Sequence, residues 1–116
     1  MSHNKKSYFF ILLILFLLFF SLETVGADGD RGYGYYLVTG KAWCDKKQYE
    51  EAIKCYKKAI EIRPCDIQGY YFLGAAYIGK GDYQEAIEIY NKTVKIKPGD
   101  NRSYSGLAMA YNMQKN

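Results

Sequence analysis

Cysteine and histidine are the side chains of this sequence that could do nucleophilic, redox or metal chemistry. The chain contains three cysteines, Cys44, Cys55 and Cys65, and one histidine, His3, which lies in a basic N-terminal segment. That segment is typical of a removable export signal, so a Cys-His or Ser-His-Asp arrangement is not available to the rest of the chain. No CxxC motif and no complete GxxxxGK(S/T) phosphate loop occurs in the sequence. We therefore expect no enzyme activity, no cofactor and no metal site.

Acidic side chains are the remaining candidates for acid–base chemistry. Glu50 and Glu51 are adjacent, and Glu85 and Glu88 lie three positions apart. Both pairs fall near the beginning of expected helices, where the helix dipole favours carboxylates and water still reaches them. We interpret both pairs as structural features of the helices.

The three cysteines leave their pairing open. Disulfides are permitted in an exported chain, but an odd number of cysteines cannot all pair within one molecule. One intrachain disulfide with a free thiol, an intermolecular disulfide, and three unpaired thiols are all compatible with the sequence.

The first 27 residues differ in character from the rest of the chain. Two lysines near the start are followed by an uninterrupted apolar run, Tyr8–Phe20, and then by small residues up to Ala27. This order predicts a secretory signal peptide over residues 1–27, cleaved after Ala27. The alternative is an uncleaved membrane anchor over residues 8–22, although spanning a bilayer usually takes roughly 20 apolar residues. In both cases we expect the remainder of the chain to be exported, with membrane attachment only if the segment is uncleaved.

The net charge argues against a nucleic acid partner. Without Lys5, Lys6 and Glu23, the exported part keeps 14 basic and 11 acidic side chains, a net charge of +3. Acidic and basic residues alternate along this part, whereas a surface that binds phosphate backbone gathers its cations on one face. We therefore expect no nucleic acid partner.

A 34-residue internal repeat dominates the rest of the sequence. Aligning Tyr33–Asp66 with Ile67–Asp100 gives thirteen identical positions without a gap, and a third copy begins at residue 101 and stops halfway. The predicted organisation is a flexible glycine-containing lead-in over residues 28–33, two full units over 33–66 and 67–100, and a partial unit over 101–116.

Each unit has the apolar spacing of two amphipathic helices. Tyr49, Ala52, Ile53, Tyr56, Ala59 and Ile60 recur at steps of three and four, as the buried face of a helix does. Asp66 and Asp100 are expected to cap the helices that follow them, and a proline two positions earlier ends the preceding helix. In the second unit, Gly81 is expected to adopt a left-handed conformation, and Asp82 with Glu85 to form a capping box. The sequence predicts an all-α fold of antiparallel helix hairpins, with Gly40 and Gly74 where two helices approach closely.

These units resemble the tetratricopeptide repeat, a 34-residue helix-turn-helix motif. The resemblance rests on its large, small and aromatic residues, alanines and proline at set intervals: Tyr36, Gly40, Trp43, Ala52, Tyr56, Ala59 and Pro64, and then Tyr70, Gly74, Tyr77, Ala86, Tyr90, Thr93 and Pro98. Thr93 alone departs from the pattern, in place of an alanine. The resemblance implies a short right-handed α-solenoid that binds a protein or peptide and has no catalytic activity.

The resemblance also implies where a partner would bind, because ligand-contacting residues in this family lie on the concave face lined by the first helix of each unit. Carried onto this chain, those places predict a groove formed by Leu37, Val38, Lys41, Cys44, Tyr71, Phe72, Ala75, Ile78, Arg102, Met109 and Met113. The set is mainly apolar, and its two cations do not match the lysine and asparagine set with which some family members hold a C-terminal carboxylate. Tyr71 and Phe72 could instead pack against neighbouring helices.

The partial third unit predicts an uncovered helix. Tyr104, Ala108 and Tyr111 occupy the positions that a second helix covers in the full units. A truncated reading frame of a longer repeat scaffold, a second copy of the chain, and another protein are each compatible with this pattern. The leading hypothesis is an exported protein-interaction module with an apolar groove, and the alternative is a self-associating structural subunit that pairs through its C-terminal helix.

Overall fold

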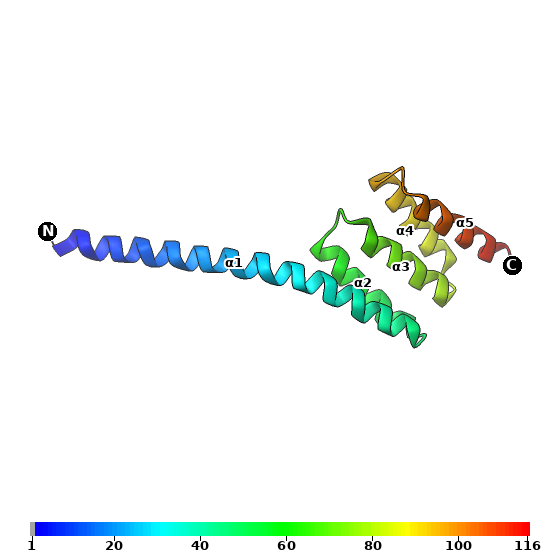
Figure 1. Ribbon diagram of the computed structural model, residues 1–116, viewed down its shortest axis with the longest axis horizontal. Helices are drawn as coiled ribbons and strands as arrows, with labels where there is room; N and C mark the ends of the chain where they lie inside the picture. The colour runs from blue at the N-terminus through cyan, green and yellow to red at the C-terminus, as the bar shows by residue number, and fades with distance from the viewer. Residues whose placement is uncertain (1) are drawn as a thin grey trace. The chain divides into compact units, whose positions relative to one another are not determined.

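The computed structural model describes residues 2–116, with side chains described for residues 5–18 and 31–116 (Figure 1). The described residues form five α-helices and no strand: α1 (Ser2–Asp45), α2 (Tyr49–Ile62), α3 (Ile67–Lys80), α4 (Tyr83–Ile96) and α5 (Asn101–Lys115). The chain divides into two compact units, and the border after Arg31 lies within α1. The all-α prediction is confirmed, and the unit Gly32–Asn116 is a helical solenoid.

The N-terminal unit is helical, and its apolar side chains from Tyr8 to Leu18 are exposed. Every residue from Tyr8 to Leu18 exposes between 43% and 66% of its surface. Within the described residues, no helix combines the length and the apolar character that crossing a membrane requires. The signal peptide remains a prediction.

The lead-in predicted to be flexible is helical, since residues 28–33 belong to α1. Tyr33 is 7% exposed, and the Arg63 guanidinium lies 4.3 Å from its ring centroid. A Cβ on Gly32 would stand 3.2 Å from the Ile62 side chain. The packing of Gly32 and Tyr33 against the end of α2 therefore outweighs the low helix propensity of Gly32.

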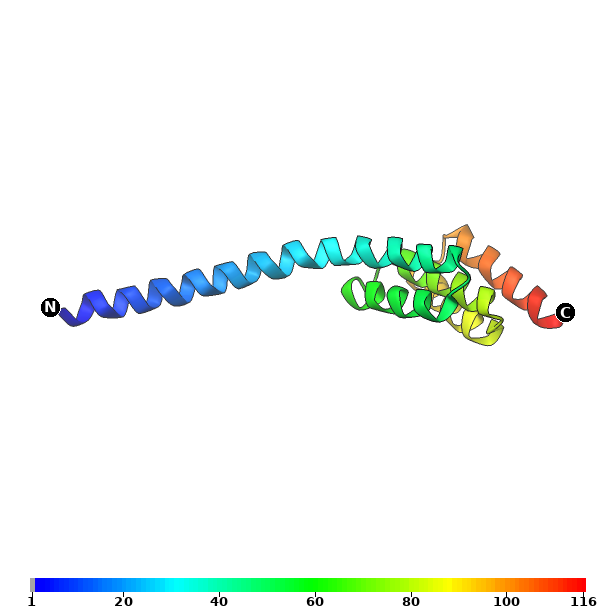
Figure 2. The same ribbon diagram turned by 90° about the horizontal axis from the view of Figure 1, so that it is seen from below.

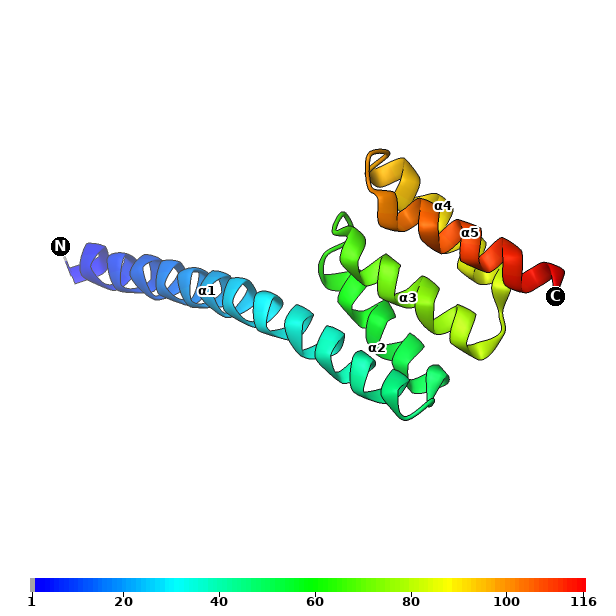
Figure 3. The same cartoon turned by 45° about the vertical axis from the view of Figure 1, so that its right-hand side comes forward.

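Antiparallel hairpins build the C-terminal unit. The last turns of α1 run alongside α2 (Figure 2), and α3 pairs with α4 in the same manner, while α5 lies along α4 (Figure 3). Between hairpins, α3 packs against α2, and α5 packs against both α4 and α3. Because α3 is covered by helices of two hairpins, nearly all of its faces carry apolar or small residues, whereas α2 and α4 are amphipathic with a charged outer face.

The turns inside the two hairpins share one backbone conformation. Gly81 has a φ of 92°, as predicted, and its counterpart 34 residues earlier, Lys47, has a φ of 60°. The capping box predicted at Asp82 is wrong. The Asp82 carboxylate makes no capping hydrogen bond and pairs with Lys80 Nζ at 2.8 Å, while the same ammonium group also pairs with Glu50 of α2.

Exchanging these two turn residues is expected to shift stability in opposite directions. Lys47→Gly should raise the free energy of unfolding by about 1 kcal/mol, because glycine has no Cβ to oppose positive φ, and Gly81→Lys should lower it by about 1 kcal/mol. Urea unfolding followed by circular dichroism measures both changes. Gly99→Lys is the control, since Gly99 has ordinary φ and open space around it. Equal effects at positions 81 and 99 would contradict this account of the turn.

The two loops between hairpins are held by the same hydrogen bonds. Asp66 Oδ1 accepts a hydrogen bond from the Gln68 N–H at 3.0 Å, and Asp100 Oδ1 accepts one from the Arg102 N–H at the same distance, so both predicted caps are confirmed. The helices before the prolines end at Ile62 and Ile96. Each loop is further tied by a tyrosine hydroxyl that donates to the proline carbonyl oxygen, from Tyr70 to Pro64 and from Tyr104 to Pro98.

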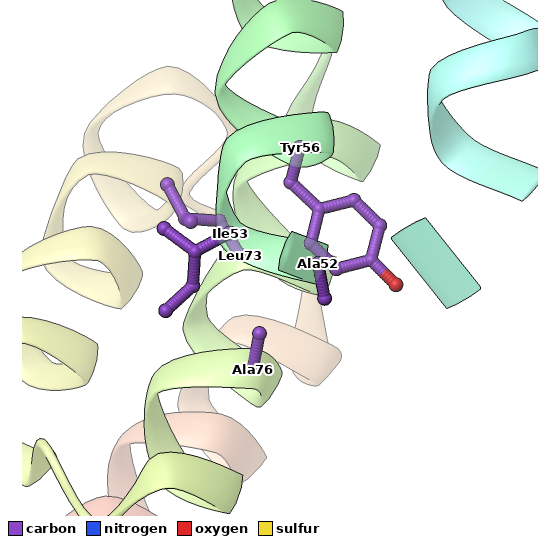
Figure 4. Close-up of a cluster of buried hydrophobic side chains, with 5 residues drawn as sticks. All are labelled: Ala52, Ile53, Tyr56, Leu73 and Ala76. Carbon is purple, nitrogen blue, oxygen red and sulfur yellow. The ribbon is translucent and has the colours of Figure 1, made fainter. Parts of the chain in front are cut away.

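The core is built from tyrosine rings seated against glycines. Figure 4 shows the first cluster, in which Tyr56, Ile53 and Ala52 of α2 meet Leu73 and Ala76 of α3. A Cβ on Gly40 would lie 2.5 Å from the Tyr56 ring, and one on Gly74 would lie 2.6 Å from the Tyr90 ring. The close approach predicted at Gly40 and Gly74 is therefore confirmed, and the tyrosine ring of the facing helix is what requires it.

Thr93, which replaces an alanine of the repeat pattern, is completely buried. Its hydroxyl donates a hydrogen bond to the Tyr90 carbonyl oxygen at 2.6 Å. This bond satisfies the polar group within its own helix, so threonine is tolerated at a position that elsewhere holds alanine.

Candidate functional site

The first helices of the hairpins, α1, α3 and α5, carry the predicted groove. Between α1 and α3 lies a hollow of about 280 Å³, bordered by Leu37, Val38 and Phe72 with the polar side chains of Lys41 and Gln68. Val38 is 72% exposed, although valine favours burial. The hollow therefore offers an open apolar surface with polar groups on its border.

A second hollow lies between α3 and α5, with a volume of about 140 Å³. Its lining comes from both helices and from one ring of α4: Tyr71, Ala75, Ile78, Tyr90, Ser105, Gly106 and Met109. Met109 is 55% exposed, whereas Tyr90 is 2% exposed. The second hollow thus combines an accessible methionine with a buried tyrosine of the core.

Tyr71 and Phe72 are neighbours on α3 and border one hollow each. Their ring centroids are 5.9 Å apart in an edge-to-face arrangement. On the core side, Phe72 stacks on Tyr56 at 5.6 Å, and Tyr71 meets the edge of Tyr90 at 6.0 Å. The two rings therefore serve both the groove and the packing between helices.

The cations of the groove already have acidic partners. Lys41 Nζ lies 3.5 Å from Asp45 Oδ2 one turn later on α1. Arg102 donates from Nε and Nη2 to the Asp100 carboxylate at 3.2 and 3.0 Å, and its guanidinium lies 5.5 Å from the Tyr71 ring centroid. The hydrogen bonds from Arg102 lower the pKa of Asp100, so this pair is ionised at neutral pH.

Eight of the eleven predicted groove residues line one of the two hollows: Leu37, Val38, Lys41, Phe72, Tyr71, Ala75, Ile78 and Met109. Arg102 borders them through its contact with Tyr71. Met113 is 43% exposed on the last turns of α5 and lines neither hollow.

Cys44 does not line either hollow, in contrast to its predicted place. It packs beside the first core cluster, where the Tyr56 hydroxyl donates to its Sγ at 3.8 Å. Burial raises the pKa of the thiol above its usual value, so it stays protonated at neutral pH. In the described part of the chain, Cys44, Cys55 and Cys65 are all unpaired thiols, and Cys65 is exposed.

Tyr90 lines the second hollow, although the sequence pattern placed it only in the core between the helices. The available signal was the glycine at position 106, because two small residues, Gly74 and Gly106, leave both sides of a facing ring open.

A third hollow of about 600 Å³ lies at the loops between hairpins and was not predicted. Within the described residues, no group of histidine, cysteine and acidic side chains could hold a metal ion.

Three solved structures are similar to this chain. The chain is 28% identical to the TPR2B domain of yeast Sti1 in its complex with pHsp70, with a TM-score of 0.69, covering 73% of this chain and 68% of that one. It is 32% identical to the MamA protein (TM-score 0.66, 72% and 45% covered) and 26% identical to the TPR2AB domain of yeast Sti1 in its complex with pHSP90 (TM-score 0.70, 82% and 39% covered). The chain thus spans about two thirds of the first structure and less than half of the other two.

Family models identify the repeat directly. A model described as TPR repeat matches residues 40–81, and one described as tetratricopeptide repeat matches residues 67–100. Together they span residues 40–100, which is more than half of the chain, while none of the curated proteins compared with it matches. The helices and the turns follow this motif, and the chain belongs to the tetratricopeptide repeat family.

Proposed function

We propose that this chain is an exported protein-interaction module, without enzymatic activity, that binds a segment of a partner protein along the face formed by α1, α3 and α5. The observation that carries the proposal is the pair of apolar hollows, whose linings coincide with the ligand-contacting places of the repeat. The similar domains of yeast Sti1 are in complexes with pHsp70 and pHSP90, which supports a protein or peptide as the partner. Exposed apolar and aromatic side chains such as Val38 and Met109 are typical anchors at interfaces.

Met109→Glu tests the groove without removing a core contact. Met109 is 55% exposed, so a glutamate there should leave the helices intact but place a charge in the second hollow. Capture of the partner from an extract of the native compartment should fall at least about tenfold.

Tyr111→Glu is the matched control. Tyr111 is 48% exposed on the same helix, and a separation of two residues directs its side chain to nearly the opposite side of α5 from Met109. Capture should survive this change. Equal loss in both variants, or in neither, would remove the groove assignment.

Self-association is the second candidate function. Tyr104 and Tyr111 expose 47% and 48% of their surfaces on one face of α5, with Ala108 exposed between them. A second copy of the chain would bury these side chains. Sedimentation of the same two variants separates the candidates, because self-association requires Tyr111→Glu to lower the mass and Met109→Glu to leave it unchanged. A wild-type monomer at micromolar concentration would remove this candidate.

Export is part of the proposal and rests on the order of basic, apolar and small residues before Ala27. We expect the mature protein to begin at Asp28, which mass spectrometry of the chain isolated from its native host measures directly. An intact N-terminus in the membrane fraction would instead indicate an anchor over residues 8–22. Recovery of the intact chain from the cytoplasm would contradict export in both forms.

A further inference from the structure

The sizes and charges of the two hollows specify the chemistry of the partner segment. We propose that the segment is extended and uncharged, and that it inserts two apolar side chains, separated by two residues, on the two sides of the Tyr71–Phe72 pair. This inference rests on the proposed function, because it assigns the occupant of the same groove.

Each hollow has room for one side chain. The hollow between α3 and α5 has a volume of about 140 Å³, close to the roughly 150 Å³ of an apolar cavity that holds one benzene molecule. Its walls include Ile78, Met109 and the Tyr71 ring, so a leucine or phenylalanine side chain matches it in size and polarity.

The hollow between α1 and α3 is twice as large, at about 280 Å³. Leu37, Val38 and Phe72 supply apolar walls, while Lys41 and Gln68 place polar groups at its border. A large aromatic side chain with one polar atom, tryptophan or tyrosine, fits this combination, because its ring can be covered while its N–H or O–H finds a partner.

The Tyr71–Phe72 pair separates the two hollows and thereby sets the spacing of the anchors. Packed helices lie about 8–10 Å apart, so hollows on the two sides of α3 are separated by about one such distance. A polyproline II segment returns to the same face every three residues and rises about 9 Å over them. Side chains three or four residues apart on a helical segment lie only about 5–6 Å from one another, which is short of this separation.

The charges of the groove indicate that the partner segment is uncharged. Lys41 and Arg102 are the cations among the groove residues, and each is already paired with a carboxylate, Asp45 and Asp100 respectively. The groove is therefore close to neutral and has no spare cation for a terminal carboxylate. An acidic side chain in the hollow between α3 and α5 would lose its hydration without gaining a cationic partner, and one in the larger hollow would compete with Asp45 for Lys41.

Synthetic peptides test this inference on the full chain, kept in solution with a nonionic detergent. The peptides carry one tryptophan and one leucine at spacings from i+2 to i+7, in both orders, within a serine–proline background and with both ends blocked. Fluorescence anisotropy measures binding. We expect the i+3 peptides to bind about tenfold or more tightly than the other spacings, and glutamate at either anchor to abolish binding. A free C-terminal carboxylate should leave affinity unchanged.

Tighter binding at another spacing, a requirement for a carboxylate, or absence of binding throughout the series would overturn the inference. The Met109→Glu and Tyr111→Glu variants separate its failure from failure of the proposed function. If a peptide with a different pattern binds most tightly and Met109→Glu abolishes its binding, the groove is the binding site and the two-anchor segment is wrong. If the peptides bind Met109→Glu as tightly as the wild type, the groove itself is not the binding site.

Discussion

Tyr90→Ala is expected to lower the free energy of unfolding by about 3–5 kcal/mol, the cost of removing a buried aromatic side chain. The Tyr90 ring is 2% exposed and stands between two helices, because a Cβ on either Gly74 of α3 or Gly106 of α5 would lie within 2.6 Å of it. Its loss would leave cavities on both sides of α4. A small domain is stabilised by only about 5–15 kcal/mol, so this single change should remove a large part of the total.

Urea unfolding followed by the helical circular dichroism signal measures this loss. Tyr104→Ala is the matched control, since Tyr104 is 47% exposed and removal of its ring should cost about 1 kcal/mol or less, mainly through the hydrogen bond to Pro98. Similar losses for the two variants would show that the ring of Tyr90 does not hold α3, α4 and α5 together.

The substitution of glycine by alanine should have opposite effects at two positions. Gly74→Ala is expected to destabilise the protein by about 1–3 kcal/mol, because the new methyl group would overlap the Tyr90 ring. That ring cannot retreat, since Gly106 contacts its other side. Gly34→Ala should instead stabilise the protein by about 0.5–1 kcal/mol, because Gly34 lies within α1 with open space around it and alanine is the better helix former.

Both variants change one hydrogen to one methyl group within a helix, so each serves as the control for the other. Thermal and urea unfolding of the two, at equal protein concentration, measure the difference. If Gly74→Ala were as stable as Gly34→Ala, the close seating of Tyr90 against α3 would be contradicted. A second variant, Gly106→Ala, should reproduce the loss seen at Gly74, because it meets the same ring from α5.

Much of the fold could be predicted from the sequence because a repeat supplies the same local information twice. Asp66 and Asp100 cap their helices with the same geometry, and Gly81 adopts the expected left-handed conformation. The predictions that proved wrong also concern local structure. Asp82 has a capping residue's identity and position, but Lys80 competes for its carboxylate through an ion pair. The lead-in predicted to be flexible, residues 28–33, contains two glycines but is helical, and its Gly32 and Tyr33 contact the end of α2.

The groove was predicted less completely than the fold. The 34-residue period predicted Val38, Phe72 and Met109 on one face, and these residues line the two hollows. That a partner binds there stays a prediction. Register alone could not show that Cys44 turns toward Tyr56, or that Tyr71 and Phe72 also pack against the core. Whether a side chain on that face is open depends on the helix opposite it, and that helix is distant in the sequence.

The sequence by itself determined the 34-residue period, the pairing of helices within each unit and the residues that begin and end them, because backbone preferences and capping act over a few neighbouring positions. Only the tertiary structure decided that Tyr90 lies between Gly74 and Gly106, and that the first-helix face is divided into two hollows by Tyr71 and Phe72. Such features arise where side chains from three helices meet, and their shape is set by packing that no single segment encodes.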